Sequence, residues 1–158
     1  WCMEESFEKV EGVLEVISGY SGGTTENPSY KEVTYGKSGH FEVIKIKYDI
    51  TKINYKKLLD IFWINVDPFD GMGQFCDKGN QYKSVIFYLD NNQRQAAKQS
   101  KLEIKSKLGK ISTKILPSTT FYKAENYHQN YAGKKPLRYK FYRYSCGRDK
   151  RLGELWKK

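Results

Sequence analysis

The spacing of apolar residues changes along this chain, and the order of those changes constrains its fold more than any other feature of the sequence. Residues 41–49 place lysines and apolar side chains at alternating positions, which is typical of a half-buried β-strand. Residues 54–63 repeat their apolar side chains at helical spacing, and Asn54 is the expected N-cap. The same analysis predicts further helices at 3–10 and 90–109, and further strands at 13–18, 82–89 and 111–116.

This order of elements predicts one α+β domain over residues 1–158, a two-layer sandwich in which helices pack on a mixed β-sheet. The sequence contains no internal repeat and no linker that would divide it. The helix expected at 3–10 has no strand before it, so we expect a strand upstream of Trp1 to complete a βαβ unit. Residues from Phe121 onward show no steady period and are expected to be irregular or briefly helical.

Two long loops rich in glycine are expected between these elements, at 19–39 and 67–81. Loops of this length inside a compact domain are usually functional. Polar, titratable and aromatic side chains gather in and next to them, namely Tyr20, Tyr30, Glu42, Asp67, Asp70, Cys76, Asp77 and Tyr82. The loops are therefore the expected location of a functional site.

Glu42 lies between Phe41 and Val43 at the start of an apolar strand. A carboxyl group drawn into apolar surroundings has a raised pKa and can act as an acid. The alternative is a glutamate at the strand edge that faces water, and the spacing alone favours this alternative.

The chain has three cysteines and two histidines, and none of them has the spacing of a zinc site, so no metal is expected. An odd and sparse cysteine count argues against a disulfide framework. The thiols are therefore either inert or part of a thiol enzyme, and base rates favour inert thiols.

Each cysteine lies in a different electrostatic setting. Cys2 begins a helix, and a helix N-terminus favours the thiolate. Cys76 is followed by an aspartate, whose negative charge disfavours the thiolate. Cys146 lies in a segment expected to be flexible, between Arg143 and Arg148, which favour ionisation and exposure. The thiol of Cys146 is therefore the one expected to meet another thiol.

The net charge is +10, and most of it lies at the C-terminus, where residues 134–158 hold ten Lys or Arg against two acidic residues. A basic segment with interleaved aromatic residues can bind nucleic acid, but a solvated surface is the favoured interpretation. No apolar run approaches the roughly 20 residues that a membrane span needs, so no membrane partner is expected.

A series of short segments resembles, in sequence and in order, the signature motifs of the peptide methionine sulfoxide reductase A family. Any one of these segments is weakly specific, but together they extend over essentially the whole chain. They are Trp1-Cys2-Met3-Glu4, Gly19-Tyr20-Ser21-Gly22-Gly23, Asn27-Pro28-Ser29-Tyr30, Gly39-His40-Phe41-Glu42-Val43, Phe62-Trp63 with Asp67-Pro68, Gly73-Gln74-Phe75-Cys76-Asp77 with Gln81-Tyr82, and Ala124-Glu125-Asn126-Tyr127-His128-Gln129.

The resemblance implies an activity and a fold. The family reduces the S-epimer of methionine sulfoxide, free or in proteins, within a two-layer α+β domain that has a ferredoxin-like core. The resemblance also implies thiol chemistry without a metal or an organic cofactor. A thiolate attacks the sulfoxide sulfur, methionine leaves, and the enzyme retains a sulfenic acid. A second cysteine condenses with that acid to a disulfide, which thioredoxin reduces.

The same resemblance assigns roles to residues of this chain. It implies that Glu42 is the acid, that Tyr30 and Tyr82 donate hydrogen bonds to the sulfoxide oxygen, and that Asp77 holds this network together. Trp1, with a phenylalanine before it, is expected to seat the S-methyl group of the substrate.

The cysteines depart from the family pattern. The family nucleophile lies two residues before the signature tryptophan, which is Trp1 here, so we expect it to precede the sequence. Cys2 is the alternative nucleophile. Several relatives carry two cysteines near the C-terminus, whereas Cys146 is alone in that region. Cys146 is therefore the expected resolving cysteine, and Cys76 is its alternative.

Two other functions remain open from the sequence. One is a basic, aromatic module that binds nucleic acid through residues 134–158, and the other is an inactive structural relative of the reductases. The expected oligomeric state is a monomer. The sequence does not define a compartment, although the cytoplasm is favoured.

Overall fold

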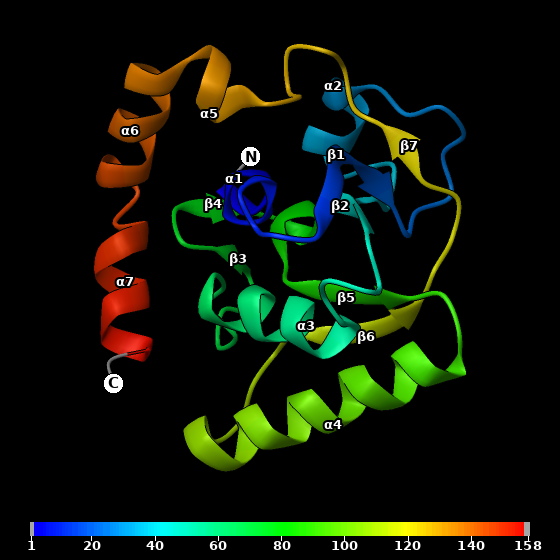
Figure 1. Cartoon of the computed structure of the whole chain (residues 1–158). Coiled ribbons are helices and arrows are strands. Elements are labelled where there is room, and N and C mark those ends of the chain that lie inside the picture. The colour runs from blue at the N-terminus through cyan, green and yellow to red at the C-terminus, as the bar shows by residue number, and fades with distance from the viewer. Residues whose placement is uncertain (1, 157–158) are drawn as a thin grey trace.

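A computed structural model describes residues 2–156 and confirms the α+β class. Figure 1 shows the course of the chain, with the long hairpin of β1 and β2 beside the pair β5 and β6. The elements are α1 (Cys2–Glu8), β1 (Val13–Ser21), α2 (Tyr30–Thr34), β2 (Phe41–Tyr48), α3 (Tyr55–Ile64), β3 (Gly73–Gln74), β4 (Asp77–Lys78), the 3₁₀ helix η1 (Asn80–Tyr82), β5 (Val85–Tyr88), α4 (Asn91–Leu108), β6 (Lys114–Pro117), β7 (Tyr122–Lys123), α5 (Tyr131–Lys134), α6 (Pro136–Ser145) and α7 (Arg148–Leu155).

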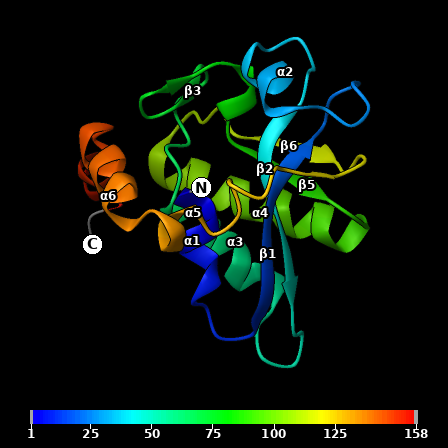
Figure 2. The ribbon, with the colours of Figure 1, turned by 90° about the horizontal axis from the view of Figure 1, so that it is seen from above.

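The strands form two main groups. In the first group β1 pairs antiparallel with β2 on one side and with β7 on the other, and the register places Tyr20 opposite Glu42. In the second group β5 and β6 are parallel. Figure 2 shows β1 and β2 running side by side along their whole length. Both pairing directions occur within residues 2–156, but each group has only one of them, whereas the sequence analysis expected one mixed sheet.

The order α1, β1, β2, α3, β5 matches a ferredoxin-like βαββαβ unit from its first helix onward. Within residues 2–156, β2 pairs with β1 and β5 pairs with β6, and each has one edge without a strand partner. A cavity of about 440 Å³ separates these two strands and is lined by residues 43–46 and 85–87. The cavity therefore occupies the position of a central strand.

The core is built between helices and strands. One cluster joins α3, β5 and α4 through Leu59, Trp63, Ile86 and Ala97, which are all at most 8% exposed. The Trp63 Nε1–H donates to Ser100 Oγ at 3.1 Å, so its polar atom is satisfied in the interior. A second cluster around Phe7 joins α1 to α3 and to the β1–β2 hairpin. These contacts hold the helices on the sheet as the sequence pattern predicted.

Local signals at several helix ends are confirmed. The Asn54 side chain accepts from Lys57 N–H at the start of α3, and the Asp90 side chain accepts from Gln93 N–H at the start of α4.

Gly23 lies where a Cβ atom would come within 2.4 Å of backbone atoms of Ser38 and His40. The first glycine-rich loop can therefore pack directly against the segment that leads into β2.

Several boundaries differ from the sequence-based expectation. Residues 19–39 are not one irregular loop, because they contain the last part of β1 and the short helix α2. A capping box between Ser29 and Glu32 forms the N-terminal end of α2. The strand expected from Tyr82 begins at Val85, since Tyr82 belongs to η1. Short-range hydrogen bonds determine where these elements begin and end, and the spacing of apolar residues does not reveal such hydrogen bonds.

The expectation for the C-terminal region was wrong. Residues 122–155, which were expected to be irregular or briefly helical, contain the strand β7 and three helices, α5, α6 and α7. In α6 the apolar residues lie on both faces, because Tyr139 is buried whereas Leu137, Phe141 and Tyr144 are more than 70% exposed. This distribution removes the amphipathic period by which a helix is recognised.

The base-rate preference for inert thiols was wrong for two of the three cysteines, whereas the expectation that Cys146 meets another thiol is confirmed. Cys76 and Cys146 form a disulfide across 70 positions of sequence, with their Cα atoms 5.1 Å apart. Cys146, expected in a flexible segment, is the C-cap of α6 and lies just before α7. The third cysteine, Cys2, is a buried free thiol. The disulfide joins the β3–β4 hairpin to the C-terminal helices.

No helix in residues 2–156 combines the length and the apolar character needed to cross a membrane.

We predict that Trp63→Ala lowers the free energy of unfolding by about 3–5 kcal/mol, because it leaves a cavity in the α3–β5–α4 cluster. Denaturant unfolding followed by circular dichroism would measure the loss. Leu102→Ala is the control, since Leu102 is 59% exposed on α4 and should change stability by at most about 0.5 kcal/mol. Equal losses for both variants would contradict this assignment of the core.

Candidate active site

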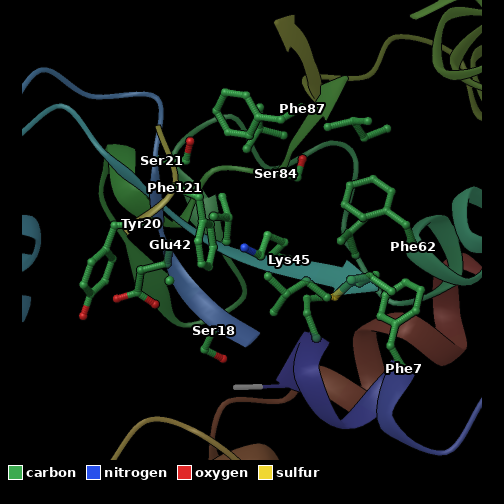
Figure 3. Close-up of a pocket in the computed structure, with 18 of the residues that line it drawn as sticks. Phe7, Ser18, Tyr20, Ser21, Glu42, Lys45, Phe62, Ser84, Phe87 and Phe121 are labelled. Atoms are coloured by element: carbon green, nitrogen blue, oxygen red, sulfur yellow. The ribbon is translucent and has the colours of Figure 1, made fainter. Parts of the chain in front are cut away.

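One end of the cavity between β2 and β5 is polar and the other is apolar. Figure 3 shows Tyr20, Glu42 and Ser18 gathered at one end, and Phe7 and Phe62 at the other. The β1–β2 register brings Tyr20 and Glu42 together, since residues directly opposite in an antiparallel pair share a face of the sheet. The structure therefore places the expected acid inside a cavity instead of at a water-facing edge.

The surroundings of Glu42 favour its protonated form. The pKa of Glu42 is raised to about 7, mainly by burial and in smaller part by the nearby carboxylates of Asp77 and Glu125. A carboxyl group with this pKa carries a proton in a large fraction of molecules near neutral pH. It can therefore donate a proton near neutral pH, where an ordinary glutamate has already lost its proton.

The two expected phenolic donors lie in the same cavity. Tyr82 comes from η1 and Tyr30 from the first position of α2. Burial and the charge of Glu42 raise the pKa of Tyr82 to about 12, so its hydroxyl stays protonated and can donate a hydrogen bond. The Tyr30 backbone N–H donates to Glu125 Oε1 at 2.7 Å. Both tyrosines are thus brought to the cavity that holds Glu42.

Asp77 also lines the cavity, from β4. Its Oδ2 accepts a hydrogen bond from the hydroxyl of Tyr142 on α6. Burial and this hydrogen bond raise the pKa of Tyr142 well above its ordinary value. Asp77 therefore links the cavity to the C-terminal helices.

Three side chains at this end were not assigned a role from the sequence. Tyr20 donates its hydroxyl hydrogen to Glu125 Oε2 at 2.8 Å, and Tyr142 donates to Asp77. The segment 124–129 had been recognised as a motif, and this was the available signal for Glu125. No signal was available for Tyr142, because α6 lacks a helical period.

The cysteines occupy two places. Cys2 lines the cavity at the start of α1. Cys76 and Cys146 are bonded to each other directly beside the Asp77–Tyr142 pair, and the Cys76 residue is exposed. The disulfide is therefore next to the polar end of the cavity and open to a partner. Trp1, expected to seat the substrate methyl group, lies outside the described residues.

Cys76, Asp77 and Cys146 are also close enough to be considered as metal ligands, since their ligand atoms lie within 4.8 Å of one another. The two sulfurs are joined in a disulfide, which leaves one carboxylate as a charged donor. A structural zinc site needs four such ligands. This group does not fit a metal in the oxidised state.

Three arginines of the basic C-terminal segment form contacts within the protein. Arg143 forms an ion pair with Asp149 at 2.6 Å, and Arg151 forms one with Asp67 at 2.7 Å. Arg148 is only 7% exposed and its guanidinium lies 4.4 Å from the ring centre of Phe75. The interpretation of this segment as a solvated surface was therefore wrong for the buried Arg148. Arg143 joins α6 to α7, and Arg151 joins α7 to Asp67 in the rest of the domain.

Comparison with known proteins identifies close relatives. Residues 1–158 match the family described as peptide methionine sulfoxide reductase. The chain is 46% identical to peptide methionine sulfoxide reductase MsrA 2 of Caulobacter vibrioides, over 99% of this chain and 80% of that protein. It is 45% identical to peptide methionine sulfoxide reductase MsrA of Halalkalibacterium halodurans, over 100% of this chain and 92% of that protein.

Solved structures show the same fold. Mxr1 from Saccharomyces cerevisiae in reduced form superposes with a TM-score of 0.82 at 32% identity, over 86% of this chain and 80% of Mxr1. Methionine sulfoxide reductase A of Corynebacterium diphtheriae gives a TM-score of 0.80 at 34% identity, over 85% of this chain and 69% of that one. These relatives confirm the α+β architecture and the family resemblance recognised in the sequence.

We predict that the carboxyl band of protonated Glu42 disappears from the infrared spectrum as the pH rises through about 7. Glu42→Gln should remove this titration. Glu32→Gln is the control, because hydrogen bonds from the backbone and side chain of Ser29 hold the pKa of Glu32 below its ordinary value. A Glu42 carboxyl group already ionised at acidic pH would contradict the burial argument.

Proposed function

The chain belongs to the peptide methionine sulfoxide reductase family, and from this premise we propose that its cavity reduces methionine sulfoxide with Glu42 as the acid. The enzyme reduces the S-epimer of methionine sulfoxide, free or in proteins, to methionine, and thioredoxin recycles it. The observation that carries the site assignment is the position of Glu42, whose raised pKa coincides with a polar cavity end that also holds Tyr82 and Tyr30.

The first step needs a proton at the substrate oxygen. A cysteine thiolate attacks the sulfoxide sulfur, and the oxygen takes a proton from Glu42 as the negative charge moves onto it. The S–O bond to methionine then breaks, the oxygen transfers to the cysteine sulfur as a sulfenic acid, and methionine leaves as the reduced product. The hydroxyl groups of Tyr30 and Tyr82 supply hydrogen bonds where this charge develops, and Asp77 maintains the network.

The nucleophile is proposed to lie on a strand that precedes Trp1. An apolar strand between β2 and β5 would fill the cavity and pair with the two strand edges that lack a partner within residues 2–156. The C-terminal end of such a strand leads directly into α1, so a cysteine there would lie close to Glu42. Cys2 remains the alternative nucleophile, since it is a free thiol in the cavity lining.

Recycling is assigned to the disulfide pair. Cys146 attacks the sulfenic sulfur, a disulfide forms, and water leaves. Because Cys76 lies within bonding distance of Cys146, thiol–disulfide exchange can then move the disulfide to Cys76–Cys146. Its exposed cysteine suits attack by a protein dithiol. Mxr1, which is 32% identical to this chain, has also been solved in complex with Trx2. This recycling requires a reducing compartment, and we propose the cytoplasm.

We predict that the protein with its natural N-terminus reduces the S-epimer of a methionine sulfoxide substrate with dithiothreitol and leaves the R-epimer. In a single turnover, Glu42→Gln should slow the chemical step by roughly 10²- to 10⁴-fold, because glutamine keeps the shape but cannot transfer a proton. Chiral separation of the products and quenched-flow rates provide the measurements. Equal use of both epimers would overturn the function, and an unchanged single-turnover rate would remove Glu42 from the mechanism.

We further predict that Cys146→Ser releases one equivalent of methionine and then stalls as a sulfenic acid with thioredoxin, while it keeps some turnover with small thiols. Trapping of the sulfenic acid and mass spectrometry would show where the oxidised sulfur lies. Cys76→Ser is the matched variant and should still form the first disulfide. If Cys146→Ser recycles normally and the disulfide contains Cys76 or Cys2, the resolving role belongs to that cysteine.

A further inference from the structure

Glu125 contacts two tyrosines of the polar cavity end through different carboxylate oxygens. Its Oε1 accepts from the Tyr30 backbone N–H at 2.7 Å, and its Oε2 accepts from the Tyr20 hydroxyl at 2.8 Å. The same Oε2 lies 3.7 Å from His128 Nε2. One side chain thus joins α2, β1 and the segment that follows β7.

The segment that carries Glu125 is itself fixed to the sheet and to α1. The Gln129 side chain accepts from Ser18 N–H at 2.9 Å and donates to Ser18 O at 2.8 Å. The Asn130 N–H donates at 2.8 Å to the carboxylate of Glu4, which is only 2% exposed. A side chain on such an anchored segment holds its partners more precisely than one on a mobile loop.

Tyr30 is held from two directions. Glu125 binds its backbone N–H, and the His128 ring packs on its ring with centroids 4.6 Å apart. Tyr30 is the first residue of α2, a helix of five residues, so its own helix supplies little to orient it. The placement of the Tyr30 ring at the cavity therefore depends on residues 125–128.

We propose that Glu125 is a positioning residue of the reductase site, which holds Tyr30 and Tyr20 at the polar end of the cavity beside Glu42. This inference rests on the function proposed above. Glu125 does not line the cavity, so it acts through the tyrosines and through its charge, without contact to the substrate.

The charge of Glu125 provides a second route to Glu42. Burial alone would raise the pKa of Glu125, but hydrogen bonds from backbone N–H groups and from the Tyr20 hydroxyl hold it below its ordinary value. Glu125 is therefore ionised at neutral pH. The charges that act on the pKa of Glu42 are the N-terminal amino group, which lowers it, and Asp77 and Glu125, which raise it. Tyr20 and Tyr82 also face Glu42, since its charge raises the pKa of each of them. The negative charge of Glu125 helps to keep the proton on Glu42 as the pH rises.

The decisive variant is Glu125→Gln, which keeps the size of the side chain and an acceptor for Tyr30 but removes the charge. Because the negative charge raises the pKa of Glu42, its loss lowers that pKa. The alkaline decline of kcat should therefore move to lower pH, by roughly half a pH unit. Glu125→Ala also removes the anchor, and kcat should fall roughly 10- to 100-fold even at acidic pH as Tyr30 loses its position.

The measurement is kcat and KM for the S-epimer from acidic to alkaline pH, with the protein in its natural length. Glu103→Gln is the matched control, since it removes one exposed carboxylate from α4 and should leave the profile unchanged. A purely structural role for Glu125 would lower activity equally at every pH. An unshifted profile for Glu125→Gln would overturn the proposal, whether or not Glu125→Ala folds.

The failure of this proposal is distinguishable from failure of the proposed function. If wild-type protein is active and Glu42→Gln is slow, but Glu125→Gln has the wild-type profile, only the role of Glu125 is wrong. If wild-type protein lacks activity, or Glu42→Gln is as fast as wild type, the function or the acid assignment is wrong.

Discussion

The register between β1 and β2 determines where Glu42, the proposed acid, lies. It sets Tyr20 opposite Glu42, and opposite residues of an antiparallel pair share one face. A slip of one residue would move Glu42 to the other face of the hairpin and would break its relation to Asp77 and Tyr82. The hydroxyl of Tyr20 in turn donates to Glu125, which links the segment after β7 to this end of the cavity. The β1–β2 backbone pairing thus determines which side chains face the cavity, and the chemistry of the cavity depends on that pairing.

The sequence predicted those features that depend on neighbouring residues. Alternation in residues 41–49 located β2 to within a residue, and the side chain of Asn54 placed the start of α3. The resemblance in motifs then assigned Glu42 its role, where spacing alone favoured a water-facing position. Spacing failed there because the groups that enclose Glu42 come from η1, β4 and residue 125, which are distant in the sequence.

The features that the sequence did not predict arise from long-range contacts. The Cys76–Cys146 bond spans 70 positions, and three cysteines allow more than one pairing. Helix α6 carries aromatic residues on its exposed face as well as its buried face, so its period is hidden until the fold shows that Tyr139 and Tyr142 point inward. The role of the C-terminal arginines also depends on where Asp67 and Phe75 lie in space.

The Asp77 side and the Glu125 side of the candidate site are held by different kinds of interaction. The Asp77 side is joined to α6 through Tyr142 and through the neighbouring disulfide, a covalent link that reduction would break. The Glu125 side is held by hydrogen bonds to Tyr30 and Tyr20, and neither cysteine takes part in them. Reduction of the disulfide would therefore remove a covalent link beside Asp77, and it would break none of the hydrogen bonds of Glu125.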